Sequence, residues 1–307
     1  MQVRAVLTPE IVETFQRDGY VVVPDLLSAE EVEHFESAVT GAVRRRREGI
    51  DVAPLAERSR YQQSFIQCMN LWEDDADVAR LTFHQRVGQA AAELLEVDAV
   101  RLWHDQALYK EAGGRETDAH QDHPYWPIAE TASITAWIPL VGSTIASGAM
   151  GYVPGSHLVG MRKFVNIFFG EPEDILTDPE ISGVEPVFVE VPAGSIAFHH
   201  GLTVHLAKPN TTDRDRAVHT IIYFPDGSTR GYPFPHFSVD RGSIAVGETI
   251  DSDATPIAFP RPDGEPIPPL PAVPLRIGGS IAARKIIEPS ALPGGAGGGT
   301  RTLTDRS

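Results

Sequence analysis

The chain has 307 residues, of which 42% are hydrophobic and 22% charged, a composition typical of a soluble globular protein. Its formal net charge of −16 repels phosphate backbones, so we expect no nucleic-acid partner. No apolar run approaches the ~20 residues that a membrane helix needs, and the N-terminus lacks the apolar core of a signal peptide. We therefore expect a soluble, cytoplasmic protein without a membrane partner, present as a monomer or homodimer.

Residues 1–98 are predicted to be helical around one short strand. The first helix starts at Thr8-Pro9, because proline fits the first turn, and it ends at Gly19. The elements that follow are a strand at Tyr20–Pro24, a helix opened by the capping box Ser28-Ala29-Glu30-Glu31, and a helix at Gln85–Leu95.

Two features of this region have an ordinary and a functional interpretation. The basic run Arg44–Arg47 falls at the predicted end of a helix, where cations complement the helix dipole. We favour that role over a phosphate-binding patch. Cys68 is the only cysteine, so no intramolecular disulfide can form, and we favour a buried, unreactive thiol over a nucleophile.

From Ala99 onward, short β-branched and aromatic segments alternate with turn residues. The predicted strands are Val100–Lys110, Ser133–Leu140, Ala149–Val153, Pro186–Val191, Ser195–His199 and Ala217–Phe224. No repeat of fixed period is present, which argues against propellers and solenoids. The pattern predicts a mainly β fold with flanking helices, in which a double-stranded β-helix, or cupin-like jelly roll, follows the N-terminal helices.

We expect one domain over residues 1–290. It comprises a helical N-terminal region (residues 1–98), a jelly-roll core (residues 99–225) and an aromatic, proline-rich arm (residues 226–290). Seven prolines between Pro260 and Pro274 exclude regular structure there, so the arm should be extended and lie on the domain. Residues 291–307, with the glycine-rich run Pro293–Gly299, are predicted to be a flexible tail.

A metal site is predicted around an H-x-D motif. In an extended segment His120 and Asp122 point to the same side, so an imidazole and a carboxylate can reach one ion. Such a pair is common by chance and gains weight only with a second histidine from a distant strand. The candidates are His199, His200 and His205. Two histidines and one carboxylate on one face are typical of non-haem Fe(II) oxygenases.

Arg216 begins the apolar run that follows these histidines. A guanidinium near the metal would bind a carboxylate through two hydrogen bonds, which suits a cosubstrate such as 2-oxoglutarate. On spacing alone, solvated or core histidines and a surface Arg216 are an equally good interpretation.

The ordered series of motifs resembles the phytanoyl-CoA dioxygenase (PhyH) family of Fe(II)- and 2-oxoglutarate-dependent oxygenases. It extends from about Leu7 to Tyr223 and includes Phe15–Val23, Lys110, His120-Gln121-Asp122, Trp137–Leu140, Pro154–His157, Gly194-Ser195, His205, Asn210 and Arg216-Ala217. The resemblance implies that His120, Asp122 and His205 bind iron and that Arg216 binds the distal carboxylate of 2-oxoglutarate. The eleven-residue step from His205 to Arg216 matches the family and favours His205 over His199 and His200.

Further residues are assigned to the site with their ordinary alternatives. Trp137 matches a family position beside the cosubstrate, although a strand tryptophan is as often core. Gln106 and Lys110 share one face of a predicted strand and can contact 2-oxoglutarate or substrate, or extend to solvent. The resemblance places Gln121 near the pocket, and we assign it with Tyr125 and Trp126, which follow the H-x-D motif, to the substrate pocket.

The resemblance implies a dioxygenase that uses Fe(II), 2-oxoglutarate and O2 and releases succinate and CO2. Because related halogenases replace the carboxylate ligand by a small residue, Asp122 makes hydroxylation the expected outcome. Desaturation, cyclisation and epimerisation use the same ligands and stay open.

The acidic surface argues against coenzyme A thioesters, and the aromatic residues favour an apolar or ring-containing metabolite, as in secondary metabolism. The alternatives are a cupin-like isomerase or O2-only dioxygenase without 2-oxoglutarate, and a non-catalytic metal-binding protein of the same fold.

Overall fold

The computed structural model describes residues 5–50, 53–168, 174–262, 265–273 and 275. The helices in these ranges are α1 (Pro9–Asp18), α2 (Ala29–Arg47), α3 (Arg60–Ser64), α4 (Ala76–Thr82), α5 (Gln85–Leu95) and α6 (Phe237–Asp240). The strands are β1 (Tyr20–Val23), β2 (Ile66–Met69), β3 (Val100–Lys110), β4 (Thr117–His120), β5 (Ile134–Pro139), β6 (Met150–Tyr152), β7 (Val187–Val189), β8 (Ile196–His200), β9 (His205–Ala207), β10 (Arg216–Pro225) and β11 (Ile257–Phe259).

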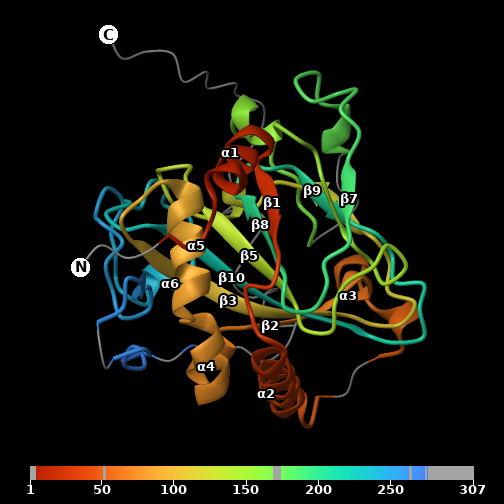
Figure 1. Ribbon diagram of the computed structural model, residues 1–307, viewed down its shortest axis with the longest axis horizontal. Coiled ribbons are helices and arrows are strands. Elements are labelled where there is room, and N and C mark those ends of the chain that lie inside the picture. Colours follow the sequence, from red (N-terminus) through yellow and green to blue (C-terminus); the bar gives the residue numbers. More distant parts are fainter. Residues whose placement is uncertain (1–4, 51–52, 169–173, 263–264, 274, 276–307) are drawn as a thin grey trace.

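The strands form two antiparallel sheets (Figure 1). The larger sheet has the order β1-β8-β5-β10-β3-β11, and β2 also pairs with β3. The smaller sheet has the order β4-β9-β6-β7. Most neighbours in these sheets are distant in sequence, as in a jelly roll. The predicted mainly β fold with a double-stranded β-helix core and N-terminal helices is confirmed.

The N-terminal elements begin and end where their capping residues predict. Gly19 ends α1 with a left-handed φ of 79°, and a Cβ at this position would lie 2.5 Å from Thr203 Oγ1. Ser28 Oγ accepts a hydrogen bond from the Glu31 amide (3.2 Å), while the Glu31 carboxylate accepts one from the Ser28 amide (2.7 Å). The predicted capping box of α2 is therefore present.

The basic run lies in the last turn of α2, as predicted. Arg45 pairs with Asp75 and Arg46 with Asp74, both just before α4. Two of the four arginines thus fasten α2 to α4, which supports the structural interpretation of the run.

Helices α1, α2, α4 and α5 cover the outer face of the larger sheet (Figure 1). Val39 of α2 and Leu94 of α5 are fully buried in one apolar cluster with Ile221 and Tyr223 of β10. Cys68 belongs to the same cluster, and burial raises the pKa of its thiol to about 11. The thiol is buried, as predicted, and little thiolate forms near neutral pH.

The inner face of the larger sheet packs against the smaller sheet. Trp137 and Val218 from the larger sheet meet Met150 and Tyr152 from the smaller one in a second cluster. The register also places the predicted site residues: Arg216 pairs with Lys110, and His120 pairs with His205. Residues from both sheets therefore face one interior space.

The sequence pattern did not predict several short elements, namely α3, α4, α6, β2, β4, β9 and β11. The strand β4 has the polar sequence Thr-Asp-Ala-His, so no apolar alternation marks it. The arm contributes β11, which pairs with β3 in the larger sheet. The glycine-rich tail at 291–307 lies outside the described residues. Among the residues that the structure describes, no helix combines the length and apolar character needed to cross a membrane.

Asn210 fixes the loop that leads into β10. Its buried amide donates to the carbonyls of Lys110 (3.0 Å) and Arg214 (2.7 Å), and its Oδ1 accepts from the Thr212 amide (3.1 Å). Because Asn210→Ala leaves these groups unpaired, we expect the free energy of unfolding to fall by about 1–3 kcal/mol in urea denaturation.

The matched control is Thr211→Ala, at an exposed neighbouring position, with an expected change within about 0.5 kcal/mol. Equal losses for the two variants would contradict this role of Asn210.

Candidate active site

His120 and His205 face each other from neighbouring strands. They are directly paired in register across β4 and β9, and their ring centroids are 4.3 Å apart. The Nδ1 atom of His120 lies 2.8 Å from the carbonyl of Asp118, and that of His205 lies 2.9 Å from the carbonyl of Thr203. Because each Nδ1 donates to a carbonyl, each Nε2 carries a free lone pair, the form that binds a metal.

Asp122 brings a carboxylate to the same point. Its backbone has φ −77° and ψ −43°, so the chain turns after β4 and the predicted straight H-x-D segment is wrong at this residue. Asp122 Oδ1 lies 3.6 Å from His120 Nε2 and 3.5 Å from His205 Nε2. The turn thus brings the Asp122 carboxylate next to the histidines, the result that the extended segment was expected to give.

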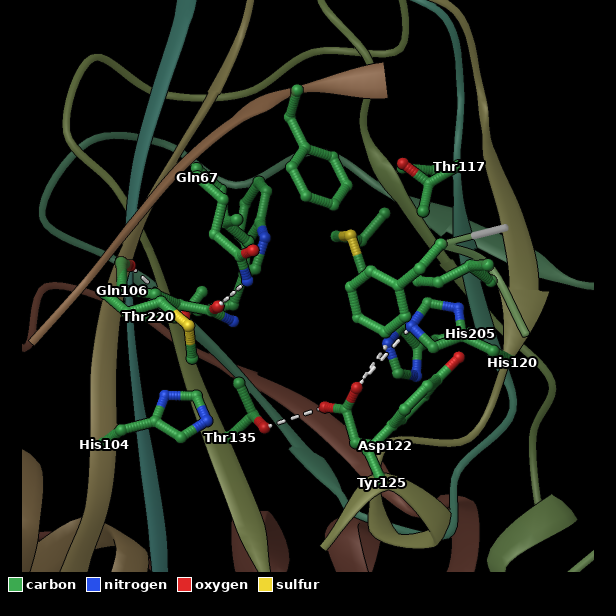
Figure 2. Close-up of a pocket in the computed structure, with 18 of the residues that line it drawn as sticks. Gln67, His104, Gln106, Thr117, His120, Asp122, Tyr125, Thr135, His205 and Thr220 are labelled. Atoms are coloured by element: carbon green, nitrogen blue, oxygen red, sulfur yellow. Dashed lines mark hydrogen bonds and ion pairs between the residues drawn. The ribbon is translucent and has the colours of Figure 1, made fainter. Parts of the chain in front are cut away.

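The other carboxylate oxygen is held by the larger sheet. Thr135 Oγ1 donates to Asp122 Oδ2 at 3.1 Å, and His199 Nε2 lies 3.2 Å from the same oxygen (Figure 2 shows the Thr135 bond). Oδ1 is thus left facing the two histidines. His199, a ligand candidate in the sequence, therefore orients the carboxylate instead.

The electrostatics suit a cationic occupant. Burial lowers the pKa of His205 to about 3, so its imidazole is neutral. Burial alone would raise the pKa of Asp122, but the imidazoles of His205, His120 and His199 outweigh this effect and hold the pKa well below its usual range. An ionised carboxylate and neutral imidazole are the forms that metal binding requires.

The donor set fits Fe(II). One ligand atom from each of His120, Asp122 and His205 lies within 4.8 Å of the other two. Two nitrogens and one oxygen on one side of an ion leave its remaining positions open for cosubstrate and O2. These three residues can therefore hold the iron.

Arg216 lies in the same pocket as the three ligands. Its guanidinium is buried 5.2 Å from the ring of Trp137, and its Nη1 donates to the carbonyl of Gly148. Its Nε has no hydrogen-bond partner, and no acidic side chain pairs with it among the described residues. Burial lowers the pKa of Arg216 to about 10, so it stays charged at neutral pH. A buried cation with an unpaired donor fits the carboxylate of 2-oxoglutarate.

Of the other three residues assigned to the cosubstrate, two line the pocket and one does not. Trp137 and Gln106 line the pocket. Lys110 is fully buried beside Arg216 in the sheet register, and its Nζ donates to the carbonyl of Arg115 at 2.5 Å. Burial, with the neighbouring Arg216, lowers the pKa of Lys110 to about 6. Lys110 is not among the pocket-lining residues, so its contact with 2-oxoglutarate stays a prediction.

Of the residues assigned to substrate, Tyr125 and Trp126 line the pocket. Gln121 does not: its amide donates to the carbonyls of Leu202 (2.7 Å) and Gly160 (3.0 Å). These bonds fasten the segment to a neighbouring loop, and the assignment of Gln121 to the substrate pocket stays a prediction.

The C-terminal arm contributes His236 and Phe237 from its aromatic segment to the pocket. The pocket also contains residues that the sequence did not single out, which include Tyr61, Phe65, Gln67 and His104. Figure 2 shows Gln67, Gln106 and His104 across the pocket from the two ligand histidines. No local motif marks these residues, because only the sheet register brings them together.

A jelly roll with two histidines and one carboxylate between its sheets defines a class of metal-binding proteins with open coordination positions. The model of the phytanoyl-CoA dioxygenase (PhyH) family matches residues 15–218. The chain therefore belongs to this family.

Solved structures are similar over most of the chain. The non-haem α-ketoglutarate-dependent carbocyclase SnoK from nogalamycin biosynthesis is 27% identical with a TM-score of 0.68, and the match covers 82% of this chain and 96% of SnoK. The epimerase SnoN in complex with Fe3+, α-ketoglutarate and nogalamycin RO is 26% identical with a TM-score of 0.66, covering 81% of this chain and 97% of SnoN.

Curated relatives match over shorter spans. A phytanoyl-CoA dioxygenase of Arabidopsis thaliana is 28% identical over 37% of this chain, and the chain spans 41% of its length. The Bos taurus phytanoyl-CoA dioxygenase domain-containing protein 1 is 26% identical over 52% of this chain, which spans 60% of its length. An ectoine dioxygenase of Stutzerimonas stutzeri is 25% identical over 71% of this chain and 77% of its own length.

The ligand assignment predicts which histidine substitution weakens metal binding. In anaerobic titrations with Fe(II), His205→Ala should lower the affinity by more than about 100-fold, beyond the range typical for loss of a residue that only orients a ligand. His200→Ala is the matched control, because His200 accepts from the Leu202 amide (3.0 Å) away from the ligands. A loss in His200→Ala as large as that in His205→Ala would refute the assignment.

Proposed function

We propose that the protein is an Fe(II)- and 2-oxoglutarate-dependent dioxygenase that oxidises an unactivated C–H bond of a small, uncharged, ring-containing molecule. The observation that carries this proposal is the meeting of two groups in one pocket. The three ligand atoms of His120, Asp122 and His205 converge there, and Arg216 lies beside them without an acidic partner among the described residues.

The chain's own residues hold and orient the reactants. His120, Asp122 and His205 hold the iron, and Arg216 binds the distal carboxylate of 2-oxoglutarate beside the ring of Trp137. When bound, iron, 2-oxoglutarate and O2 supply the oxidising chemistry, with succinate and CO2 as coproducts. Thr135 and His199 keep one oxygen of Asp122 turned towards the ligand histidines. These two contacts hold the carboxylate in one orientation, so that the other coordination positions of the metal stay open.

We infer hydroxylation and not halogenation, because the Asp122 carboxylate occupies the coordination position that a halide would need. Desaturation, cyclisation or epimerisation requires the same three ligands. Among similar structures, SnoK is described as a carbocyclase and SnoN as an epimerase. Among hydroxylation, desaturation, cyclisation and epimerisation, the position of the substrate in the pocket therefore selects the outcome, because all four use the same ligands.

The pocket lining supports an uncharged, apolar substrate. Aromatic side chains surround it, namely Tyr61, Phe65, Tyr125, Trp126, Trp137, Phe168 and Phe237. Within the described ranges, no Asp, Glu, Lys or Arg except Asp122 and Arg216 lines it. Burial lowers the pKa of His104 to about 4, so this wall residue adds no charge at neutral pH. Such a lining disfavours phosphorylated molecules, including coenzyme A thioesters.

The protein incubated with Fe(II), ascorbate, O2 and labelled 2-oxoglutarate should release succinate slowly even without substrate. In halide-free buffer we expect Asp122→Ala to abolish this release, because the iron loses its carboxylate ligand and no halide can replace it. Asp98→Ala, at an exposed position, is the control that should retain it.

Metal binding without succinate would favour an isomerase, an O2-only dioxygenase or a non-catalytic protein. Turnover that survives in Asp122→Ala would overturn the ligand set.

Arg216→Met should raise the KM for 2-oxoglutarate by about 10-fold or more, since a hydrogen-bonded charge contributes about 1.5–3 kcal/mol. The measurement is the rate of succinate release against 2-oxoglutarate concentration. Arg214→Met, an exposed arginine in the same segment, should leave the KM within about twofold. An unchanged KM in Arg216→Met would remove Arg216 from the cosubstrate site.

A further inference from the structure

A directed chain of side-chain hydrogen bonds crosses the pocket wall opposite the metal ligands, and Figure 2 shows its bond between Gln67 and Gln106. The hydroxyl of Tyr61 donates to Gln67 Oε1 at 2.7 Å, and Gln67 Nε2 donates to Gln106 Oε1 at 2.5 Å. All three residues line the pocket and come from three elements, α3, β2 and β3. The site is thus built by tertiary packing.

The direction of this chain determines what Gln106 offers to a ligand. Its Oε1 is occupied by Gln67, so the amide turns its Nε2 with two hydrogens towards the pocket. No hydrogen-bond acceptor for this Nε2 is present among the residues that the structure describes. An unused N–H donor in an aromatic pocket is costly unless a ligand or water accepts from it.

His236 adds a second donor to the same pocket. Its Nδ1 accepts from the Ser238 amide at 3.2 Å, so a neutral ring carries its proton on Nε2. The ring is buried and stacks on Trp103 at a centroid distance of 4.5 Å. Burial, with His104 and Arg230 nearby, lowers the pKa of His236 well below its usual range, so the ring is neutral.

These donors lie away from the end of the pocket where Arg216 is found. Gln106 pairs in register with Thr220, and His236 stacks on His104, which pairs with Ile222, whereas Arg216 pairs with Lys110. Four residues along a strand correspond to about 13 Å. A five-carbon dicarboxylate held between Arg216 and the metal does not need these donors. They remain for the molecule that is oxidised.

We propose that Gln106 and His236 are specificity-determining residues that bind an acceptor oxygen of the substrate, so the substrate class is an uncharged ring compound bearing a ketone, quinone or amide carbonyl. The inference rests on the proposed function, because it concerns the substrate of that same site. Tyr61 and Gln67 act as positioning residues, since they fix the orientation of the Gln106 amide. The aromatic side chains pack against the rings, and the N–H groups select the carbonyl.

The test compares two ring compounds that differ in one carbonyl, 1-tetralone and tetralin. Each is titrated anaerobically into the protein loaded with Fe(II) and 2-oxoglutarate, and binding is followed through tryptophan fluorescence, because Trp126 lines the pocket. We expect the wild-type protein to bind 1-tetralone at least about fivefold more tightly than tetralin, the effect of one neutral hydrogen bond. Equal affinities, or no binding of 1-tetralone, would overturn the proposal.

Gln106→Leu should reduce this preference by weakening 1-tetralone binding while leaving tetralin binding unchanged, since His236 remains as a donor. Gln67→Leu, which frees the Gln106 amide to rotate, should reduce the preference less. Gln16→Leu is the matched control, because Gln16 is exposed outside the pocket. An undiminished preference in Gln106→Leu would show that Gln106 does not recognise the carbonyl.

Substrate-independent succinate release separates this inference from the proposed function. For Gln106→Leu, the KM for 2-oxoglutarate shows where the residue acts, with Gln16→Leu as the control whose KM should stay within about twofold of the wild-type value. A tenfold rise in the KM of Gln106→Leu alone would place Gln106 at the cosubstrate and refute the inference, with the dioxygenase function intact. Absence of succinate release from the wild-type protein would refute the function itself, whereas the tetralone preference would still report on the donors.

Discussion

The site depends on how the two oxygens of Asp122 are divided between the two sheets. Thr135 and His199 of the larger sheet hold Oδ2, and Oδ1 faces His120 and His205 of the smaller sheet. The metal ligands are therefore fixed only when the sheets are packed together. The helices on the outer face stabilise the larger sheet, and the glycine at the end of α1 lets that helix approach the loop before β9. The helices and both sheets thus contribute to the position of the Asp122 carboxylate.

Few of the described residues that line the pocket are charged. Under the proposed function, the buried cation Arg216 binds 2-oxoglutarate and Asp122 binds iron, whereas the rest of the wall formed by described residues is aromatic or uncharged. An unpaired buried charge is costly, so the proposed binding of the anionic cosubstrate would stabilise Arg216 in the assembled site. The uncharged wall then discriminates by shape and by the N–H groups of Gln106 and His236. In this account the cosubstrate is recognised by its charge, and the substrate by its shape and its hydrogen-bond acceptor.

Much of the fold and the metal site was predictable because the signals are local. The limits of α5 agree with the sequence pattern, and β10 contains a long, mostly apolar run. The ligands were found from a short motif and an ordered series of family motifs. The turn at Asp122 and the short polar strand β4 carry no periodic signal, so they were missed. The chain from Tyr61 to Gln106 depends on pairing between segments distant in sequence, which only the folded structure reveals.

The central claim is that one pocket binds iron and 2-oxoglutarate together. The most direct measurement is the visible absorption of the anaerobic Fe(II) protein during titration with 2-oxoglutarate. A keto acid that chelates Fe(II) gives a charge-transfer band that neither component shows alone. We predict a saturable band in the wild-type protein, with no such band when succinate replaces 2-oxoglutarate. A protein that binds Fe(II) but shows no band at saturating 2-oxoglutarate would contradict the account.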